Sequence, residues 1–406
     1  MPKKIKGQSS LCVLQNNMTL SLFHMKTLLE RIKAVNSLLS PYAVPHGGNL
    51  GREHKDTEDN TRFPFQRDRD RIIHTQAFRR LKGKTQVFVA GKGDHFRARL
   101  THTMEVAQIS RDMARTLGLN EDLAECIALA HDLGHTPFGH AGENAMREDM
   151  KRHNETFEHN LQSLRVVTLL EEHKKKYPGL NLSREVLEGL MKHRTSFDEE
   201  HGHDLPRGPS LEAQVVNLAD EIAYTAHDTD DGLRAEVLHF SDFVDSPLFQ
   251  EAATKSEKSG TQVRGSIIHL LVVDAYEETE RRLSANSINS LDDVYESKTP
   301  LCTFSQGAMQ KLSALRKILE EKFYSSPAVL KHSNKGQQII HELFQAYEEN
   351  PSEKVLELQL RTKSSLPEAI KDYIAGMTDQ YALLCLKELP PRADRTPVTA
   401  TSTGGK

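Results

Sequence analysis

Four residues whose side chains bind metal ions well stand on three predicted elements of the chain: His102, the adjacent pair His131 and Asp132, and Asp220. Two imidazoles and two carboxylates suit a divalent ion of borderline to hard character, such as Mn, Fe, Co, Ni, Mg or Zn. Four protein ligands leave positions on a six-coordinate ion for water and a phosphoryl oxygen. The ligand set therefore predicts a catalytic metal site for phosphoryl transfer, with Mn or Mg expected for activity, and not a structural zinc site.

Further histidines and a glutamate surround this ligand set. His135 and His140 follow the His131-Asp132 pair closely, and His159 lies further along the chain. Glu143 comes three residues after His140, so both lie on one face of a helix and the carboxylate can orient the imidazole as a base. Each histidine taken alone is more often a surface or hydrogen-bonded core residue than a catalytic one. Their number around one metal motif favours catalytic roles.

Two predicted helices bring the first ligands together. One covers residues 98–117, has apolar residues at helical spacing and carries His102 near its start. The next begins at Asn120, a good N-cap residue, and ends at Gly134, with His131 and the aspartate after it in the last turn. Neighbouring helix residues point about 100° apart. Both can therefore reach one ion only near a helix end, which the stop at Gly134 provides.

A third helix is predicted to begin after Ser210, another N-cap residue, and it carries Asp220. Tyr224 and Asp228 follow at intervals of four residues and share the face of Asp220. The alternative is that this face is a solvated helix surface. The opposite face carries apolar residues at helical spacing, namely Leu211, Val215, Leu218, Ile222 and Ala226.

The segment 62–84 is rich in arginine and lysine. Its arginines either pair with nearby acidic residues such as Asp68 and Asp70 in a charged helix, or bind phosphate, for which guanidinium groups are natural bidentate partners. Residues 85–90 follow as a predicted short strand and turn, one of few β signals in the chain.

Composition sets limits on the class of protein. The formal net charge of -4 gives no overall attraction for nucleic acid, and no run of 18 apolar residues is present to span a membrane. The four cysteines are scattered without paired spacing, which favours free thiols in a reducing compartment. A cytoplasmic protein without a membrane partner is expected.

The pattern of predicted helices indicates an all-α fold with at most a short β-hairpin. Residues 1–24 are predicted to be a poorly ordered extension, and residues 390–406 a disordered tail. Between them, residues 25–389 are predicted to form a single helical unit, with a core at about 62–240 and a C-terminal helical part at about 241–389. Further helices are expected at 140–153, 155–173, 183–191, 262–284, 309–325, 335–348 and 366–387.

Several separate stretches of the chain resemble the HD-domain metal-dependent phosphohydrolases, and in particular the deoxyguanosine triphosphate triphosphohydrolase family. They occur in the same order and include RLTHTMEVAQ, HDLGHTPFGHAGE, FEHNLQSLRV, NLADEIAYTAHD and DYIAGMTDQYAL. The resemblance extends from about Arg62 to Leu384. It implies the helical HD fold, a divalent metal ion and a homo-oligomer, and leaves open an effector role for single-stranded DNA or a second deoxynucleotide.

The resemblance also implies roles for individual residues. His135 matches a phosphate or leaving-group contact, Arg99 a phosphate contact, and Gln86, Tyr224 and Asp228 the residues that recognise deoxyribose, with the tyrosine ring where a 2′-hydroxyl would lie. The predicted metal ligands are His102, His131, Asp132 and Asp220. The predicted catalytic residues are His140, Glu143, His135 and His159. The predicted substrate-binding residues are Arg99, Gln86, Tyr224, Asp228 and Lys192.

Together these features predict an enzyme that hydrolyses deoxynucleoside triphosphates, dGTP among them, to deoxynucleoside and tripolyphosphate. The first alternative is an HD phosphohydrolase acting on nucleoside monophosphates or other phosphoesters. The basic segment and the residues for the sugar argue against it, since a small monophosphate does not require them. The second alternative is a nucleotide- or nucleic-acid-sensing module without turnover, which the complete ligand set disfavours.

Overall fold

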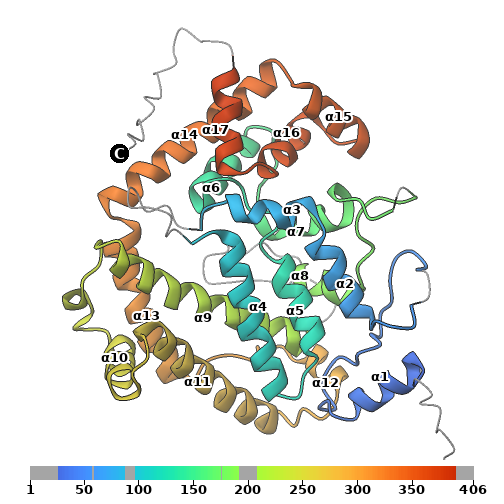
Figure 1. Cartoon of the computed structure of the whole chain (residues 1–406), viewed down its shortest axis with the longest axis vertical. Helices are drawn as coiled ribbons and strands as arrows, with labels where there is room; N and C mark the ends of the chain where they lie inside the picture. The colour runs from blue at the N-terminus through green and yellow to red at the C-terminus, as the bar shows by residue number, and fades with distance from the viewer. Residues whose placement is uncertain (1–25, 57–58, 87–96, 175, 192–207, 390–406) are drawn as a thin grey trace, which may run out of the picture.

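The structure is a computed structural model that describes residues 26–56, 59–86, 97–174, 176–191 and 208–389 (Figure 1). Helices make up nearly all of its regular structure, and β-structure within the described residues is limited to isolated bridges. The predicted all-α class is confirmed. In chain order the helices are α1 (Leu28–Asn36), α2 (Pro64–Ile73), α3 (Gln76–Arg80), α4 (Arg99–Thr116), α5 (Glu121–Ala130), α6 (Gly139–Lys151), α7 (His159–Arg165), α8 (Arg184–Met191), α9 (Leu211–Arg234), α10 (Pro247–Ser259), α11 (Val263–Ala285), α12 (Leu291–Glu296), α13 (Gln306–Ile318), α14 (Pro327–Glu349), α15 (Glu353–Thr362), α16 (Leu366–Ala375) and α17 (Asp379–Glu388). Shorter 3₁₀ or π-helical segments are η1 (Leu81–Gly83), η2 (Val166–Leu170), η3 (Phe240–Phe243) and η4 (Leu319–Tyr324).

Helices α4, α5 and α9 form the centre of the molecule, where each packs on the other two (Figure 1). The predicted caps are confirmed, since the Asn120 side chain accepts a hydrogen bond from the Leu123 amide and the Ser210 side chain accepts one from the Ala213 amide. Such caps satisfy amide groups that the first helical turn leaves without partners. The apolar faces of these three helices, including Val106 of α4, are buried against one another.

The buried apolar residues form two clusters. The first surrounds α4, α5 and α9 and continues into α10, α11 and α13. The second joins α6 to α14, α16 and α17, and includes Phe138, Met146 and Ile370. Helix α14 links the two, because its Val329 belongs to the first cluster and its Ile340 to the second. In Figure 1 the C-terminal helices α14 to α17 therefore form a layer above α6, with the central helices below it.

Several expected elements differ from those observed. The helix expected over 155–173 begins only at His159 and continues as a π-helical segment, η2. The helix expected over 366–387 is two helices, because Thr378 caps α17 after a break that follows α16. Helices α10, α12 and α15 were not predicted. Of the predicted strand at 85–90, Thr85 forms a bridge with Ala98, and residues 87–90 lie outside the described residues. The predicted extension 1–24, the tail 390–406 and Lys192 also lie outside them.

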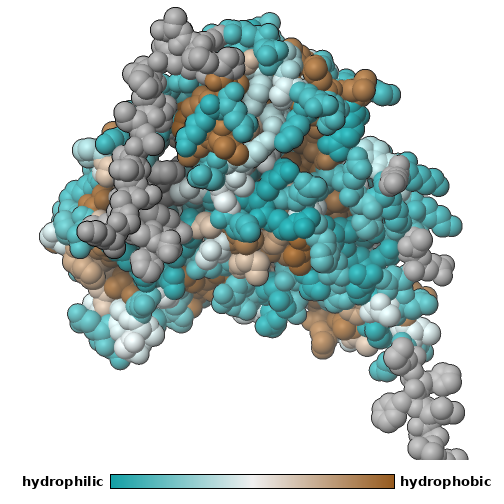
Figure 2. All heavy atoms as spheres, turned by 45° about the horizontal axis from the view of Figure 1, so that its top comes forward, coloured by the Kyte–Doolittle hydropathy of each residue, from teal (hydrophilic) through white to brown (hydrophobic). Residues whose placement is uncertain are grey.

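The surface of the molecule is mostly polar. Figure 2 shows hydrophilic side chains over most of one face, with separate hydrophobic patches among them. Among the described helices, none combines the length and apolar character that crossing a bilayer requires. The described cysteines, Cys126, Cys302 and Cys385, are buried and carry free thiols.

Candidate active site

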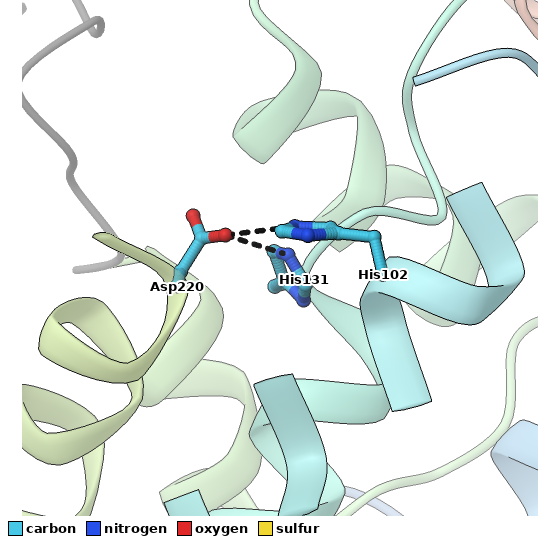
Figure 3. Close-up of side chains that lie close together, drawn as sticks. All are labelled: His102, His131 and Asp220. Carbon is cyan, nitrogen blue, oxygen red and sulfur yellow. Dashed lines mark hydrogen bonds and ion pairs between the residues drawn. The ribbon is translucent and has the colours of Figure 1, made fainter. Parts of the chain in front are cut away.

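Three of the predicted metal ligands converge from three helices. His102 lies in the first turn and a half of α4, His131 directly follows α5, and Asp220 lies in the middle of α9 (Figure 3). All three are buried. Asp220 Oδ1 lies 2.9 Å from His102 Nε2 and 3.8 Å from His131 Nε2. The polar face of α9 that carries Asp220 is thus buried against the other two helices and is not a solvated surface.

The end of α5 sets the orientation of His131. Its Nδ1 lies 2.6 Å from the carbonyl oxygen of Ala128, one turn earlier, and a carbonyl can only accept, so Nδ1 carries the proton. The other ring nitrogen, Nε2, then has its lone pair directed toward Asp220 and Asp132, which is the tautomer that a metal ligand requires.

The donor atoms fit a divalent metal ion. Two donors that each lie about 2.1 Å from one ion are about 3 Å apart at a right angle and about 4 Å apart when opposite. Asp132 Oδ1 lies 3.5 Å from His131 Nε2, and Asp132 Oδ2 lies 3.9 Å from His102 Nε2. With the distances to Asp220, these separations fall in or close to that range. His102, His131 and Asp220 form one group that could hold the ion, whereas Asp132 groups with His135 and His159. Asp132 remains a candidate fourth ligand, because each of its oxygens lies within 4 Å of one of the two histidines.

Asp132 also connects the metal ligands to Arg99. The Arg99 guanidinium is 1% exposed, and its NH1 lies 2.9 Å from Asp132 Oδ2. Burial alone would raise the pKa of Asp132, but the charges of Arg99 and the neighbouring histidines hold it well below its usual range. The Nε and NH2 groups of Arg99 have no hydrogen-bond partner among the described residues, so they are available as donors to an anion.

A second group of titratable side chains includes Asp132. Asp132, His135 and His159 each offer a ligand atom within 4.8 Å of the others. His135 Nε2 lies 3.1 Å from Asp132 Oδ1, and the His135 ring stacks on the His159 ring with centroids 3.9 Å apart. Burial together with the charges of Arg99 and His159 holds the pKa of His135 well below its usual range, so its imidazole is neutral near pH 7.

Glu143 contacts the histidines of this second group, but its main partner differs from the predicted one. Its Oε1 lies 3.1 Å from His159 Nδ1 and accepts a further bond from the His159 amide. The predicted partner, His140, is 57% exposed, and its Nδ1 lies 3.9 Å from Glu143 Oε2, beyond hydrogen-bond range. Burial opposes ionisation of Glu143, yet the charges of His159 and His135 lower its pKa below the usual range. In this structure the base-orienter pair is His159 and Glu143.

The predicted sugar-binding residues occupy a buried surface that starts at Asp220. Tyr224 and Asp228 follow on the same face of α9 and are 7% and 4% exposed. The Arg316 guanidinium lies over the Tyr224 ring, 5.2 Å from its centroid, and the Tyr324 hydroxyl donates a hydrogen bond to Asp228. Burial raises the pKa of Asp228 to about 7, even though the Tyr324 hydrogen bond lowers it.

Gln86 lies at the opposite edge of the site. Its backbone carbonyl passes so close to the start of α6 that a Cβ on Gly139 would be 3.0 Å from it, and Gly139 has a φ of 58°, which favours glycine. The Gln86 side-chain oxygen is buried and has no hydrogen-bond partner among the described residues. An acceptor in this state is a candidate to bind a hydroxyl group of a ligand.

Four arginines of the basic segment 62–84 follow the simpler of the two interpretations. They form ion pairs with acidic residues of the protein, whereas Arg79 and Arg80 bond to backbone carbonyls and to Gln76. The pairs are Arg62 with Asp59 and Asp70, Arg67 with Asp56, Arg69 with Glu125, and Arg71 with Asp56. Arg99 is left as the candidate for phosphate binding.

Residues that sequence reasoning missed hold the turn that follows Asp132. Lys84 and Asp379 bond to this turn, and Phe138 within it has a φ of 64°. Thr378 and Asp379 have the composition of a helix start, which is a usable signal. Nothing in the sequence, however, indicates contact between Asp379 and a residue 241 positions earlier.

Comparisons with known proteins find similarity over most of the chain. The HD domain model matches residues 99–225, and the phosphohydrolase-associated domain model matches residues 302–388. A protein of Azoarcus sp. is 44% identical over 360 residues, which cover 85% of this chain and 94% of that protein. A protein of Brucella canis is 42% identical over 390 residues, covering 88% and 96%. One of Leptospira interrogans is 41% identical over 368 residues, covering 87% and 96%. Each is named a deoxyguanosinetriphosphate triphosphohydrolase-like protein.

Proposed function

Because the chain belongs to the HD-domain family of deoxyguanosinetriphosphate triphosphohydrolase-like proteins, we propose that it hydrolyses deoxynucleoside triphosphates, dGTP among them, to deoxynucleoside and tripolyphosphate. The family itself supports the coarser statement that the chain is a phosphohydrolase with a metal-binding HD domain. The choice of deoxynucleoside triphosphates as substrates depends on which residues surround the phosphate and the sugar in the site.

The observation that carries the proposal is the buried face of α9. Asp220, Tyr224 and Asp228 stand at successive intervals of four residues, so one rigid helix face joins the metal ligands to a tyrosine ring and a carboxylate. A deoxynucleotide with its α-phosphate at the metal ligands would have its sugar beside Tyr224. The ring would exclude a 2′-hydroxyl, while Asp228 and Gln86 offer oxygen atoms to the 3′-hydroxyl.

The residues around the α-phosphate have separate tasks in this proposal. A divalent ion held by His102, His131 and Asp220, with Asp132 proposed as the fourth ligand, would lower the pKa of a water molecule and polarise the phosphorus. Arg99 directs two donor groups toward the phosphate oxygens. Breaking the bond to the 5′-oxygen of the nucleoside requires a proton on that oxygen.

His159 is the residue best placed to handle that proton. Its Nδ1 donates to Glu143 at 3.1 Å, which leaves Nε2 for proton transfer and lets the carboxylate stabilise the charged ring. His140, which is exposed at the mouth of the site, is proposed as a second proton-carrying group, and His135 as a neutral contact to the leaving group or phosphate.

A second candidate function is hydrolysis of a nucleoside monophosphate or another phosphoester. The ion pairs of Arg62, Arg67 and Arg71 favour it, because they remove much of the positive charge that a triphosphate was expected to need. The Tyr224 and Asp228 surface favours the triphosphohydrolase, since a simple phosphoesterase needs no buried sugar pocket. Assembly into a homo-oligomer, and activation by single-stranded DNA or a second deoxynucleotide, are parts of the proposal that rest on the resemblance alone.

The test is incubation of the purified, metal-stripped protein with deoxynucleoside triphosphates, ribonucleoside triphosphates and nucleoside monophosphates, each with Mn or Mg. Ion-exchange chromatography then separates the products. Tripolyphosphate supports the proposal, whereas pyrophosphate or orthophosphate as the first product points to a different reaction. Asp220→Asn should abolish the reaction. Asp230→Asn, the same change on the outer part of the same helix, is the matched control, since Asp230 contacts only arginines outside the site.

A further inference from the structure

The turn between the metal ligands and α6 is fixed at both ends by residues from distant parts of the chain. This turn, residues 132–139, begins at the metal ligand Asp132 and ends where α6 starts with Gly139. It carries His135, which stacks on His159, and it leads directly into His140. Its conformation therefore determines where the groups of the second titratable cluster lie relative to the metal ligands.

Lys84 holds the first part of the turn. Its ammonium nitrogen lies 2.5 Å from the carbonyl oxygen of His135 and 2.8 Å from the carbonyl oxygen of Ala375, the last residue of α16. The side chain is 2% exposed, although a lysine is rarely buried so completely without a carboxylate partner. The two bonds need two N–H groups, which the ammonium and the neutral amine both have. Lys84 therefore links the backbone of His135 to α16 whether its side chain is protonated or neutral.

Asp379 holds the second part of the turn. Its Oδ1 accepts a hydrogen bond from the Phe138 amide at 3.0 Å, and its Oδ2 accepts bonds from the Thr85 amide at 3.0 Å and the Thr85 hydroxyl at 2.5 Å. Phe138 is the N-cap of α6 and has a φ of 64°. A residue with a Cβ adopts this left-handed conformation only where its surroundings impose it.

Helix α14 restrains the same residue from another side. A Cβ on Gly336 would lie 2.7 Å from Phe138 Cβ, so the helix backbone approaches the ring closely only because glycine stands there. Helices α14, α16 and α17 all belong to the C-terminal layer seen above α6 in Figure 1. That layer contributes none of the residues proposed above to bind the metal or the nucleotide, yet it contacts the turn directly at Phe138 and, through Lys84, at His135.

We propose that the C-terminal helices serve the reaction by bracing the turn 132–139, and that Lys84 and Asp379 are positioning residues for the candidate active site. This inference rests on the proposed function, because it assigns them to the same hydrolytic site. Neither side chain touches the substrate. Each acts through the backbone of the turn, on His135 in one case and on Phe138 in the other.

Two substitutions break the brace and one matched control leaves it intact. Asp379→Asn keeps the shape of the side chain, but its NH₂ group must face one of the N–H donors that the carboxylate accepts. Lys84→Met removes both bonds. The control is Asp372→Asn on α16, a buried carboxylate that also joins the C-terminal layer to the core, through Gln162 and Arg165 of α7, without contacting the turn.

If Lys84 and Asp379 position the turn, their substitution should lower the rate of the chemical step and leave substrate binding unchanged. Under single-turnover conditions the hydrolysis rate at saturating dGTP should fall roughly 10- to 100-fold in Asp379→Asn and in Lys84→Met, since small displacements of reacting groups have effects of this size. Metal content and nucleotide affinity should stay close to those of the wild type. Asp372→Asn should keep the wild-type rate at a temperature where all variants are folded by circular dichroism.

Amide hydrogen exchange gives a readout that needs no substrate. Peptides covering residues 132–140 should exchange faster in Asp379→Asn and Lys84→Met than in the wild type or in Asp372→Asn. If Lys84→Met does not fold, the isosteric Asp379→Asn decides alone. Unchanged exchange in Asp379→Asn, faster exchange with an unchanged rate, or an equal loss of rate in Asp372→Asn would each overturn the inference. If the wild type hydrolyses no nucleotide, the proposed function fails, and the exchange comparison alone still decides whether the brace exists.

Discussion

The buried carboxyl of Asp228 makes the stability of the protein depend on pH in a way that can be calculated. The side chain is 4% exposed and accepts a hydrogen bond from the Tyr324 hydroxyl. Burial raises its pKa from the usual 3.8 to about 7. The uncharged amide of Asn has the same shape and can accept the same hydrogen bond, so Asp228→Asn removes the ionisation and little else.

The size of the effect follows from the shift of about three pKa units. One unit corresponds to about 1.4 kcal/mol, so ionising Asp228 in the folded protein costs up to about 4 kcal/mol relative to the unfolded chain. Because the folded pKa is raised, the stabilising contribution of the bound proton is fully present below pH 4 and is lost as the pH rises through 7. Asp228→Asn has no carboxyl group to ionise, so its stability does not fall in this way as the pH rises.

Urea denaturation of the metal-free wild type and of Asp228→Asn at several pH values between 4 and 8 measures this difference. The free energies of unfolding should be nearly equal at pH 4, and the variant should become more stable as the pH rises, by up to about 4 kcal/mol above pH 7. Tyr324→Phe removes the hydrogen bond that favours the charged form, so in this variant the decline should continue to higher pH and the total loss should be larger than in the wild type. A difference between wild type and Asp228→Asn that does not change with pH would refute the reasoning.

Other substitutions separate metal binding, sugar selection and proton transfer. Asp220→Ala should lose bound metal and nearly all turnover, as measured by elemental analysis, whereas Asp230→Ala should retain both; full metal occupancy in Asp220→Ala would show that Asp220 is not a ligand. Tyr224→Ala should raise the kcat/KM for ribonucleotides relative to deoxynucleotides, and an unchanged ratio in a folded, active variant would exclude the proposed role of the ring. His159→Ala should lower kcat by about 10²- to 10⁴-fold with its metal content intact. His140→Ala should lower kcat less than His159→Ala does, because Glu143 bonds to His159 and not to His140. A larger loss in His140→Ala would instead support the pairing of His140 with Glu143 that their spacing in the sequence predicts.

Local sequence signals were sufficient for the three helices that bring His102, His131 and Asp220 together. The caps at Asn120 and Ser210 and the apolar stripes follow from short-range rules. The predicted end of the second helix at Gly134 was wrong, because α5 ends at Ala130 and His131 is its C-cap. Once those helices pack through their apolar faces, the residues on the facing sides, His102 and Asp220, must approach one another.

Spacing was a weaker guide where two partners competed for one group. His140 and Glu143 share a helix face, but the buried carboxylate bonds to His159, whose backbone amide also reaches it. Spacing was also a weak guide for the arginines of α2, because they bond to acidic residues that the fold brings close. The contacts of Lys84 with Ala375 and of Asp379 with Thr85 span more than 290 residues, a distance at which periodicity and capping carry no information.

The central claim is that water attacks the α-phosphorus of a deoxynucleoside triphosphate and displaces the 5′-oxygen of the nucleoside. Hydrolysis of dGTP in water enriched in oxygen-18, followed by mass spectrometry of both products, tests it directly. The heavy oxygen is expected in tripolyphosphate and not in deoxyguanosine, because the bond to the 5′-oxygen is the one that breaks. Heavy oxygen in the nucleoside, or products consisting of a nucleotide with pyrophosphate or orthophosphate, would contradict it.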